Sequence, residues 1–164
     1  PYRYCNEERS RTEVFTASNR AEARAIAAQS LVLLNNQGGL LPLKKTGTIA
    51  VVGPLADNRV NMTGTWSVAA RFAESVSLMD GLKAATGDKA KLLYALGSNL
   101  YLDPVFQQSA TPFGKTIPRD ERPAEVLIEE AVAAARQSDV VIAALGESAE
   151  PPKYMAGFSD RLAT

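Results

Sequence analysis

The chain contains no histidine and a single cysteine, Cys5, among its 164 residues. Without histidine, the chain alone cannot form a Ser-His-Asp triad, a Cys-His dyad or an imidazole metal site. One cysteine excludes an internal disulfide and Cys-x-x-Cys chemistry, and Cys5 is interpreted as an unreactive thiol near one end of the chain. Any chemistry must therefore come from carboxylates, hydroxyls, amides, Lys and Arg, or aromatic side chains.

An excess of one charge is also absent, because 18 Lys and Arg balance 18 Asp and Glu. A net charge of zero gives no electrostatic argument for nucleic acid or an anionic membrane as a partner.

No apolar run approaches the roughly 18 residues that a membrane span needs. The beginning, PYRYCNEERSR, lacks the pattern of a signal peptide, so we expect that a signal was removed or that the chain begins inside a longer protein.

Three short apolar runs are present, at residues 49–52, 91–96 and 139–145. None alternates with polar residues, which is typical of parallel strands covered on both faces. Stretches with helical periodicity separate them, at residues 76–86 and 123–137, and the second places Leu127, Ile128 and Ala131 on one face. The order of elements predicts an α/β fold with a mostly parallel sheet between helices.

The N-terminal part of the chain has a different pattern. Residues 1–18 are polar and aperiodic, and we interpret them as a connecting arm. A helix is predicted to begin at Asn19, with Glu22 completing a capping box. Its core-facing stripe follows helical spacing through Ala23, Ile26, Ala27, Ser30, Leu31 and Leu34.

Each predicted strand ends at a glycine, namely Gly53, Gly97 and Gly146. Binding sites in parallel sheets lie at the carboxyl ends of the strands, so the candidate surface consists of loops 53–67, 97–103 and 146–161. The insertion between Gly97 and Pro123 is too long for a plain connection, and we expect it to be functional, to face a partner or to be mobile.

Phosphate binding is disfavoured in the first of these loops, TIAVVGPLADNRVNMTGTWS. A dinucleotide loop needs closely spaced glycines, whereas here no second glycine follows Gly53 until Gly64. Pro54 also removes an amide that an anion would need. No GxxxxGK[ST] pattern occurs in the chain.

Two other features of these loops suggest carbohydrate chemistry. Trp66, the only tryptophan, lies in a Gly/Thr/Ser-rich stretch where an indole can stack on a pyranose, although it could equally fill the core beneath its own loop. Glycosidases need two carboxyl groups, and three carboxylates follow the third strand. Solvated loop charge remains the favoured interpretation of these three, which are Glu147, Glu150 and Asp160.

Four segments in order, LVLLNNQGGLLPLKK, TIAVVGPLAD, GTWS and DVVIAALGES, resemble the second domain of family 3 glycoside hydrolases of the bacterial β-glucosidase type. The resemblance covers roughly residues 1–150. It implies a three-layer α/β sandwich, here a shortened version of the family's six-stranded sheet. Residues 1–18 then correspond to the linker from a preceding (β/α)8 barrel, residues 19–150 to a partial sandwich domain and residues 151–164 to a divergent tail.

The same resemblance implies hydrolysis of terminal β-linked sugars with retention, without metal or organic cofactor. The family's nucleophile is an aspartate on the barrel, and its acid/base is usually a glutamate on the loop after the strand that here ends at Leu145. Trp66 matches a tryptophan that flanks the leaving-group subsite. Phe158 occupies the position that best matches the acid/base, ahead of Ser159-Asp160-Arg161, so no catalytic residue is assigned to this chain.

The sequence therefore predicts the partial second domain of a β-glucosidase-like hydrolase, which caps the active site of a barrel missing from this chain. The substrate of the whole enzyme would be a β-linked glucoside or oligosaccharide, and the isolated chain is expected to be inactive. Bacterial members are commonly exported, so a periplasmic or secreted location is expected. Two alternatives stay open: a stand-alone, non-catalytic α/β ligand-binding or interaction module, and a chain that folds only against a partner, including a second copy of itself as a homo-oligomer.

Overall fold

The computed structural model describes residues 5–63, 67, 71–109 and 118–148. The chain divides into two compact units, Pro1–Leu43 and Lys44–Thr164. The first unit contains the helices α1 (Arg9–Thr12) and α2 (Ala17–Ser30) and a 3-10 turn at Gln37–Gly39. None of the described residues of this unit is buried.

Helix α2 begins earlier than predicted, since its N-cap is Thr16 rather than Asn19. Thr16 has an extended backbone, and its hydroxyl accepts a hydrogen bond of 3.1 Å from the amide of Asn19. The side chain of Asn19 instead donates to the carbonyl of Glu13 at 2.8 Å. The predicted capping box between Asn19 and Glu22 is therefore wrong, because a threonine three residues upstream already caps the helix.

The prediction that the helix continues through Leu34, the last residue of its apolar stripe, is also wrong. Helix α2 ends at Ser30, and Leu31 is extended, with φ −71° and ψ 132°. No residue of α2 is buried, so its apolar stripe does not face a core. Residues 31–34 form a continuous apolar run, and such a run fits an extended segment as well as the last turn of a helix.

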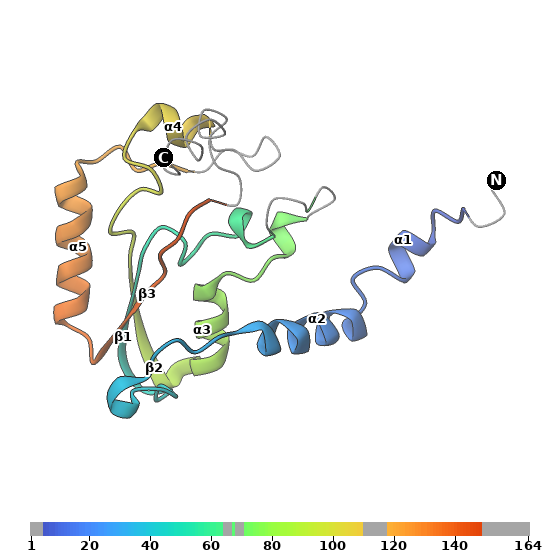
Figure 1. Cartoon of the computed structure of the whole chain (residues 1–164), viewed down its shortest axis with the longest axis horizontal. Coiled ribbons are helices and arrows are strands. Elements are labelled where there is room, and N and C mark those ends of the chain that lie inside the picture. Colours follow the sequence, from blue (N-terminus) through green and yellow to red (C-terminus); the bar gives the residue numbers. More distant parts are fainter. Residues whose placement is uncertain (1–4, 64–66, 68–70, 110–117, 149–164) are drawn as a thin grey trace, which may run out of the picture. The chain divides into compact units, whose positions relative to one another are not determined.

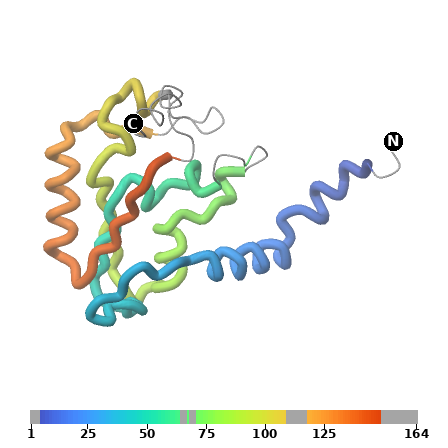
Figure 2. Tube along the Cα trace, viewed as in Figure 1, coloured from blue at the N-terminus to red at the C-terminus, as the bar shows by residue number. Residues whose placement is uncertain are grey.

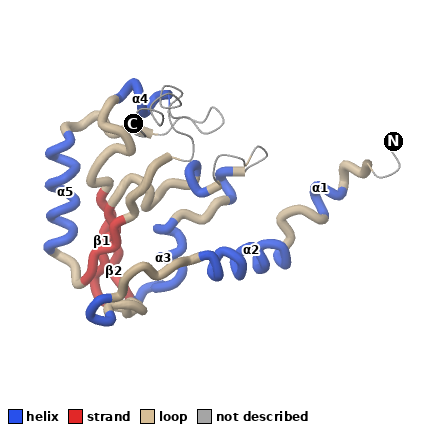
Figure 3. The backbone as a smooth tube through the Cα atoms, in the orientation of Figure 1, coloured by secondary structure: helices blue, strands red, loops and turns tan. Residues whose placement is uncertain are grey.

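The second unit contains a sheet of three described strands: β1 (Gly47–Val52), β2 (Ala90–Ala95) and β3 (Val140–Ala143). They are ordered β2-β1-β3, and both pairings are parallel. In the register, Ile49 of β1 lies opposite Leu92 on one side and Val140 on the other. The prediction of three parallel strands is confirmed, and Figure 3 shows β1 and β2 side by side.

Helices α3 (Leu78–Thr86) and α5 (Ala124–Arg136) cover opposite faces of this sheet (Figure 1). The chain runs from β1 to β2 in one direction along the sheet and from β2 to β3 in the other. Right-handed crossovers therefore place the two connecting helices on opposite faces. The resulting three layers confirm the predicted α/β sandwich.

The two faces are packed with residues of different size. On the α3 face, Met79 packs with Ile49, Val51 and Ala56. On the α5 face, the cluster of buried residues that joins the helix to the sheet is made of small residues, namely Ala50, Ala95 and Ala134. Alternate residues of β1 thus serve alternate faces, as the strand period of two requires.

The helix predicted at residues 123–137 is confirmed as α5, but its buried face differs slightly. Leu127 is fully buried, as expected, whereas Ile128 is 53% exposed and Ala134 is buried in its place. The helix predicted at residues 76–86 is α3, which begins two residues later and ends at Thr86, with Gly87 as its C-cap. None of the helices in the described part of the chain is long and apolar enough to cross a membrane.

The remaining elements are short. Three 3-10 turns lie at Val60–Met62, Phe72–Glu74 and Gly87–Lys89. Helix α4 (Pro104–Ser109) lies within the long connection from β2 to α5, and Figure 2 shows the described chain leading from the sheet to this helix.

Candidate functional site

The segments that follow the three strands meet at the carboxyl edge of the sheet, as predicted for parallel strands. Gly53 follows β1 and has a φ of 120°, which a residue with a side chain rarely adopts. A Cβ on Gly53 would run into the backbone carbonyl of Ala144. The amide of Gly53 donates to the carbonyl of Ala95 at 3.1 Å, so this glycine contacts both the last residue of β2 and the segment after β3.

The loop after β1 is fastened to the N-terminus of α3 through Ser77, which is 1% exposed. The Ser77 hydroxyl donates to the carboxylate of Asp57 at 2.8 Å and accepts from the amide of Asp80 at 3.1 Å. The amide of Ser77 donates in return to Asp80 at 3.2 Å, which completes a capping box. The loop and the helix are therefore held by one hydroxyl group.

Asp80 also receives a hydrogen bond of 2.8 Å from the guanidinium of Arg59, whose other nitrogen donates to the carbonyl of Ala73 at 3.0 Å. The pKa of Asp80 is lowered, chiefly by the backbone amide of Ser77, then by the Ser77 side chain and by Arg59. Asp80 thus stays ionised as a structural group, and nothing in this arrangement prepares it to donate a proton.

The described part of the insertion (residues 98–109 and 118–122) has its own polar network. Gln107 is 1% exposed, accepts from the amide of Tyr101 at 3.3 Å and donates to the carbonyl of Pro118 at 2.9 Å. Arg119 donates to the carbonyls of Tyr101 at 2.8 Å and Leu102 at 3.0 Å. These contacts join the two described halves of the insertion.

Two further contacts connect the insertion to its surroundings. The side chain of Asn99 pairs with the backbone of Asp120, donating to its carbonyl at 2.8 Å and accepting from its amide at 3.0 Å. The hydroxyls of Tyr101 and Ser148 lie 2.9 Å apart, and Ser148 is 8% exposed. The insertion therefore contacts the loop that follows β3.

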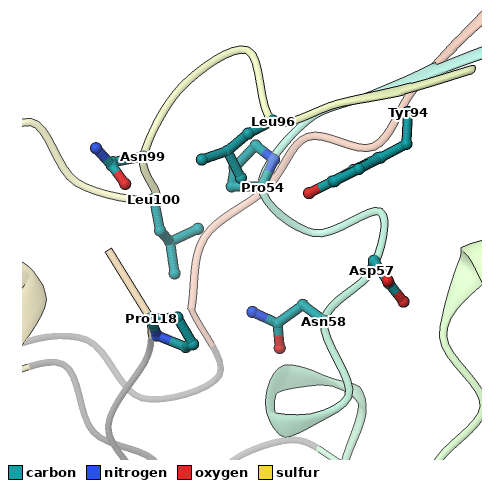
Figure 4. A pocket seen from close by; sticks show the side chains of 8 residues that line it. All are labelled: Pro54, Asp57, Asn58, Tyr94, Leu96, Asn99, Leu100 and Pro118. Atoms are coloured by element: carbon teal, nitrogen blue, oxygen red, sulfur yellow. The ribbon is translucent and has the colours of Figure 1, made fainter. Parts of the chain in front are cut away.

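A cavity of about 130 Å³ lies between the loops after β1 and β2 (Figure 4). Its wall carries the polar groups of Asp57, Asn58, Tyr94 and Asn99 beside the apolar side chains of Pro54, Leu96, Leu100 and Pro118.

The hydroxyl of Tyr94 points toward Pro54 in this view. Burial, and secondarily the negative charge of Asp57, raises the pKa of Tyr94, so the phenol stays protonated and can donate a hydrogen bond. The cavity is smaller than the about 300–1,000 Å³ of an ordinary ligand pocket, so these residues alone do not enclose a sugar.

Most of the residues that the sequence suggested for carbohydrate chemistry lie outside the described residues: Trp66, Glu150, Phe158 and Asp160. Glu147 is described and lies exposed on the loop after β3. In the described segments, no three His, Cys, Asp or Glu side chains gather as ligands for a metal ion.

Sequence reasoning missed two groups of residues that shape this edge. Ser77 could have been found, because Ser-x-x-Asp before an apolar helix is a capping-box pattern. Tyr101, Gln107 and Arg119 carry no such pattern, since their contacts depend on how the insertion folds back.

Comparison with known proteins identifies relatives over most of the chain. Residues 31–161 match the model of the glycosyl hydrolase family 3 C-terminal domain. A periplasmic beta-glucosidase of Salmonella typhimurium is 46% identical over 130 residues, which are 79% of this chain and 17% of that protein. The thermostable beta-glucosidase B of Acetivibrio thermocellus is 33% identical over 139 residues, covering 85% of this chain and 16% of that protein.

Solved structures agree with these matches. A beta-glucosidase involved in saponin metabolism from intestinal bacteria aligns with a TM-score of 0.64 and 30% identity, over 88% of this chain and 21% of that one. The beta-glucosidase of Listeria innocua in complex with isofagomine aligns with a TM-score of 0.65 and 26% identity, over 90% of this chain and 17% of that one. The chain thus spans about a fifth or less of the length of these relatives.

Proposed function

The chain belongs to glycosyl hydrolase family 3, within the C-terminal domain of that family, and from this we propose that it covers one side of a β-glucosidase active site. The whole enzyme would hydrolyse terminal β-D-glycosyl residues of a β-linked glucoside or oligosaccharide. The observation that carries the proposal is the match of residues 31–161 to the family's C-terminal domain. The named relatives above are β-glucosidases longer than this chain, in agreement with a catalytic barrel elsewhere in the enzyme.

The strand-end loops are the part of the chain proposed to face the sugar. The described loops present hydroxyl, amide and carboxylate groups at the carboxyl edge of the sheet, but their cavity is too small to hold a sugar alone. A second wall, supplied by the barrel, would complete the site. Residues 1–18 would be the linker from that barrel, residues 19–150 the partial sandwich and residues 151–164 a divergent tail.

Within this arrangement, Trp66 is proposed to line the side of the site where the leaving group sits. The proposal rests on the GTWS segment and on the ability of an indole to stack on a sugar ring. In the natural gene product that contains residues 1–164, Trp66→Ala is expected to lower kcat/KM for cellobiose about tenfold, the equivalent of one lost stacking contact. Trp66→Phe should retain part of the activity, and an unchanged kcat/KM in Trp66→Ala would remove Trp66 from the site.

A periplasmic or secreted location is proposed on the name of the Salmonella relative. Fractionation of the cells that produce the protein, with a periplasmic marker followed in parallel, would test this location.

The isolated chain is proposed to be inactive, because the nucleophile of the family is implied to lie on the barrel. An assay of the purified chain with p-nitrophenyl β-D-glucoside should give no turnover above the buffer rate. The natural gene product should hydrolyse the same substrate. Turnover by the purified chain would refute the division of the active site between two domains, and no turnover by the natural gene product would refute the proposed function.

A further inference from the structure

The loop after β3 (residues 144–148) is contacted by the last residue of β1 and by the segment that follows it. The amide of Ala144 donates to the carbonyl of Val52 at 2.7 Å, and Gly53 leaves no room for a side chain against the carbonyl of Ala144. Further along, a Cβ on Gly146 would approach the side chain of Leu55 to 2.9 Å. One side of this loop is therefore fixed by close packing against the backbone of Gly53 and the side chain of Leu55.

The insertion after β2 holds the end of the same loop. Ser148 is buried, with only 8% of its surface exposed, whereas the preceding residue, Glu147, is exposed. The loop therefore turns the side chain of Glu147 outward and that of Ser148 inward. The inward hydroxyl of Ser148 lies 2.9 Å from the hydroxyl of Tyr101, which stands 47 residues earlier in the chain. A hydrogen bond across this separation restrains the loop only if Tyr101 is itself fixed.

Tyr101 is fixed through both of its backbone groups. Its amide donates to the buried side chain of Gln107 at 3.3 Å, and its carbonyl accepts from the guanidinium of Arg119 at 2.8 Å. Arg119 lies 3.3 Å from the same oxygen of Gln107, so the two side chains that hold Tyr101 also hold each other. Charge-assisted bonds of this kind are stronger than neutral ones, which makes the segment a rigid support.

We propose that Tyr101 is a positioning residue that sets the path of residues 144–148, with Gln107 and Arg119 holding it in place. The inference rests on the proposed function, in which this loop leads from the sheet to the sugar site. In this proposal the insertion supports the loop after β3. The length of the insertion alone predicts only that it is functional, faces a partner or is mobile. Tyr101 touches Ser148 and acts on substrate only through the loop.

Hydrogen exchange on the purified chain tests the structural half of the proposal. Tyr101→Phe removes one hydroxyl and keeps the ring, so the amides of residues 144–148 should exchange about tenfold faster. Ser138→Ala is the matched control, because it removes a hydroxyl that donates to the carbonyl of Ala134 at 2.9 Å, on the amino-terminal side of β3. Unchanged exchange in Tyr101→Phe would overturn the proposal.

The rate of hydrolysis by the natural gene product tests the positioning role. Tyr101→Phe should lower kcat for an aryl β-glucoside about tenfold, leave KM within twofold and shift the pH profile of kcat, whereas Ser138→Ala should change none of these. Faster exchange with an unchanged kcat and pH profile would reduce Tyr101 to a structural role and overturn the proposal. A wild-type protein without hydrolase activity would overturn the proposed function and the catalytic half of this inference, while the exchange rates would still decide whether Tyr101 holds the loop.

Discussion

The two units of the chain use the same kinds of apolar side chain in different ways. In the first unit, Leu34 is 92% exposed and Leu31 is 81% exposed. In the second unit, Leu127 and Val51 are fully buried, and Val51 packs in the cluster with Met79 of α3. Apolar spacing in the sequence therefore predicts neither burial nor, at Leu31, the helical conformation, because both depend on which other elements pack against the residue.

The largest effect that would sharpen this comparison is expected from two leucine truncations. Leu127→Ala empties a fully buried position and should lower the free energy of unfolding by about 2–5 kcal/mol. Leu34→Ala, at a position that is 92% exposed, should change it by less than about 0.5 kcal/mol. Urea unfolding followed by circular dichroism measures both, and equal losses would break the comparison.

The next largest difference in unfolding free energy is expected between alanine substitutions at two glycines, one in each unit. Gly53→Ala combines an unfavourable φ of 120° with a clash against Ala144, and should cost roughly 2–4 kcal/mol of unfolding free energy. Gly38 also has a positive φ, of 78°, but a Cβ there meets no atom within 4 Å. Gly38→Ala should therefore cost about 1 kcal/mol or less, through strain alone. If Gly53→Ala is no more costly in thermal or urea unfolding, the close approach of the two loops is not present in solution.

The helix caps form a third pair with smaller effects. Ser77→Ala removes the capping hydroxyl of α3 and the donor to Asp57, and should lower the free energy of unfolding by about 1–2 kcal/mol. Thr16→Ala removes the corresponding cap of α2, a helix without buried residues, so the unfolding midpoint should stay constant while the helical signal falls slightly. A shift of the midpoint by Thr16→Ala would show that α2 is coupled to the packed unit.

The smallest effect concerns pH. Hydrogen bonds from the side chain and then from the backbone amide of Arg122 lower the pKa of Asp120 from 3.8 to about 2. Because the folded pKa lies below the unfolded value, the contribution is present above about pH 4 and is lost as the pH falls toward 2. Asp120→Asn should flatten the dependence of the unfolding midpoint on pH in this window. Glu13→Gln in the first unit is the control, and a flattening of the same size there would contradict the assignment to Asp120.

Much of the packed unit could be predicted from the sequence because its signals are local. Three non-alternating apolar runs predict the three parallel strands, and helical spacing at residues 76–86 and 123–137 predicts α3 and α5. The carboxyl edge of the sheet followed from the parallel order. Each of these inferences needs only a window of neighbouring residues.

The features that were predicted wrongly or missed depend on residues that lie far away in the sequence. Helical spacing places residues 31–34 in a helix, but an apolar run of four residues does not distinguish a helical turn from an extended segment, and Leu31 is extended. The contacts of Tyr101 with Ser148 and Arg119 join segments 47 and 18 residues apart. No spacing rule connects such positions, because the fold of the insertion brings them together. The role of Trp66 remains a prediction.

The central place of β1 in the sheet has a consequence for the order in which the chain is synthesised. Its partner on one side, β2, leaves the ribosome about forty residues later. On the other side, Thr48 bonds with Asp139, which lies 91 residues further along the chain. A nascent chain must therefore carry β1 half-paired while the whole of α5 is still being made. A ribosome that stalls before β3 would therefore leave one edge of β1 unpaired, although Ile49, Ala50 and Val51 of this strand are buried in the finished fold.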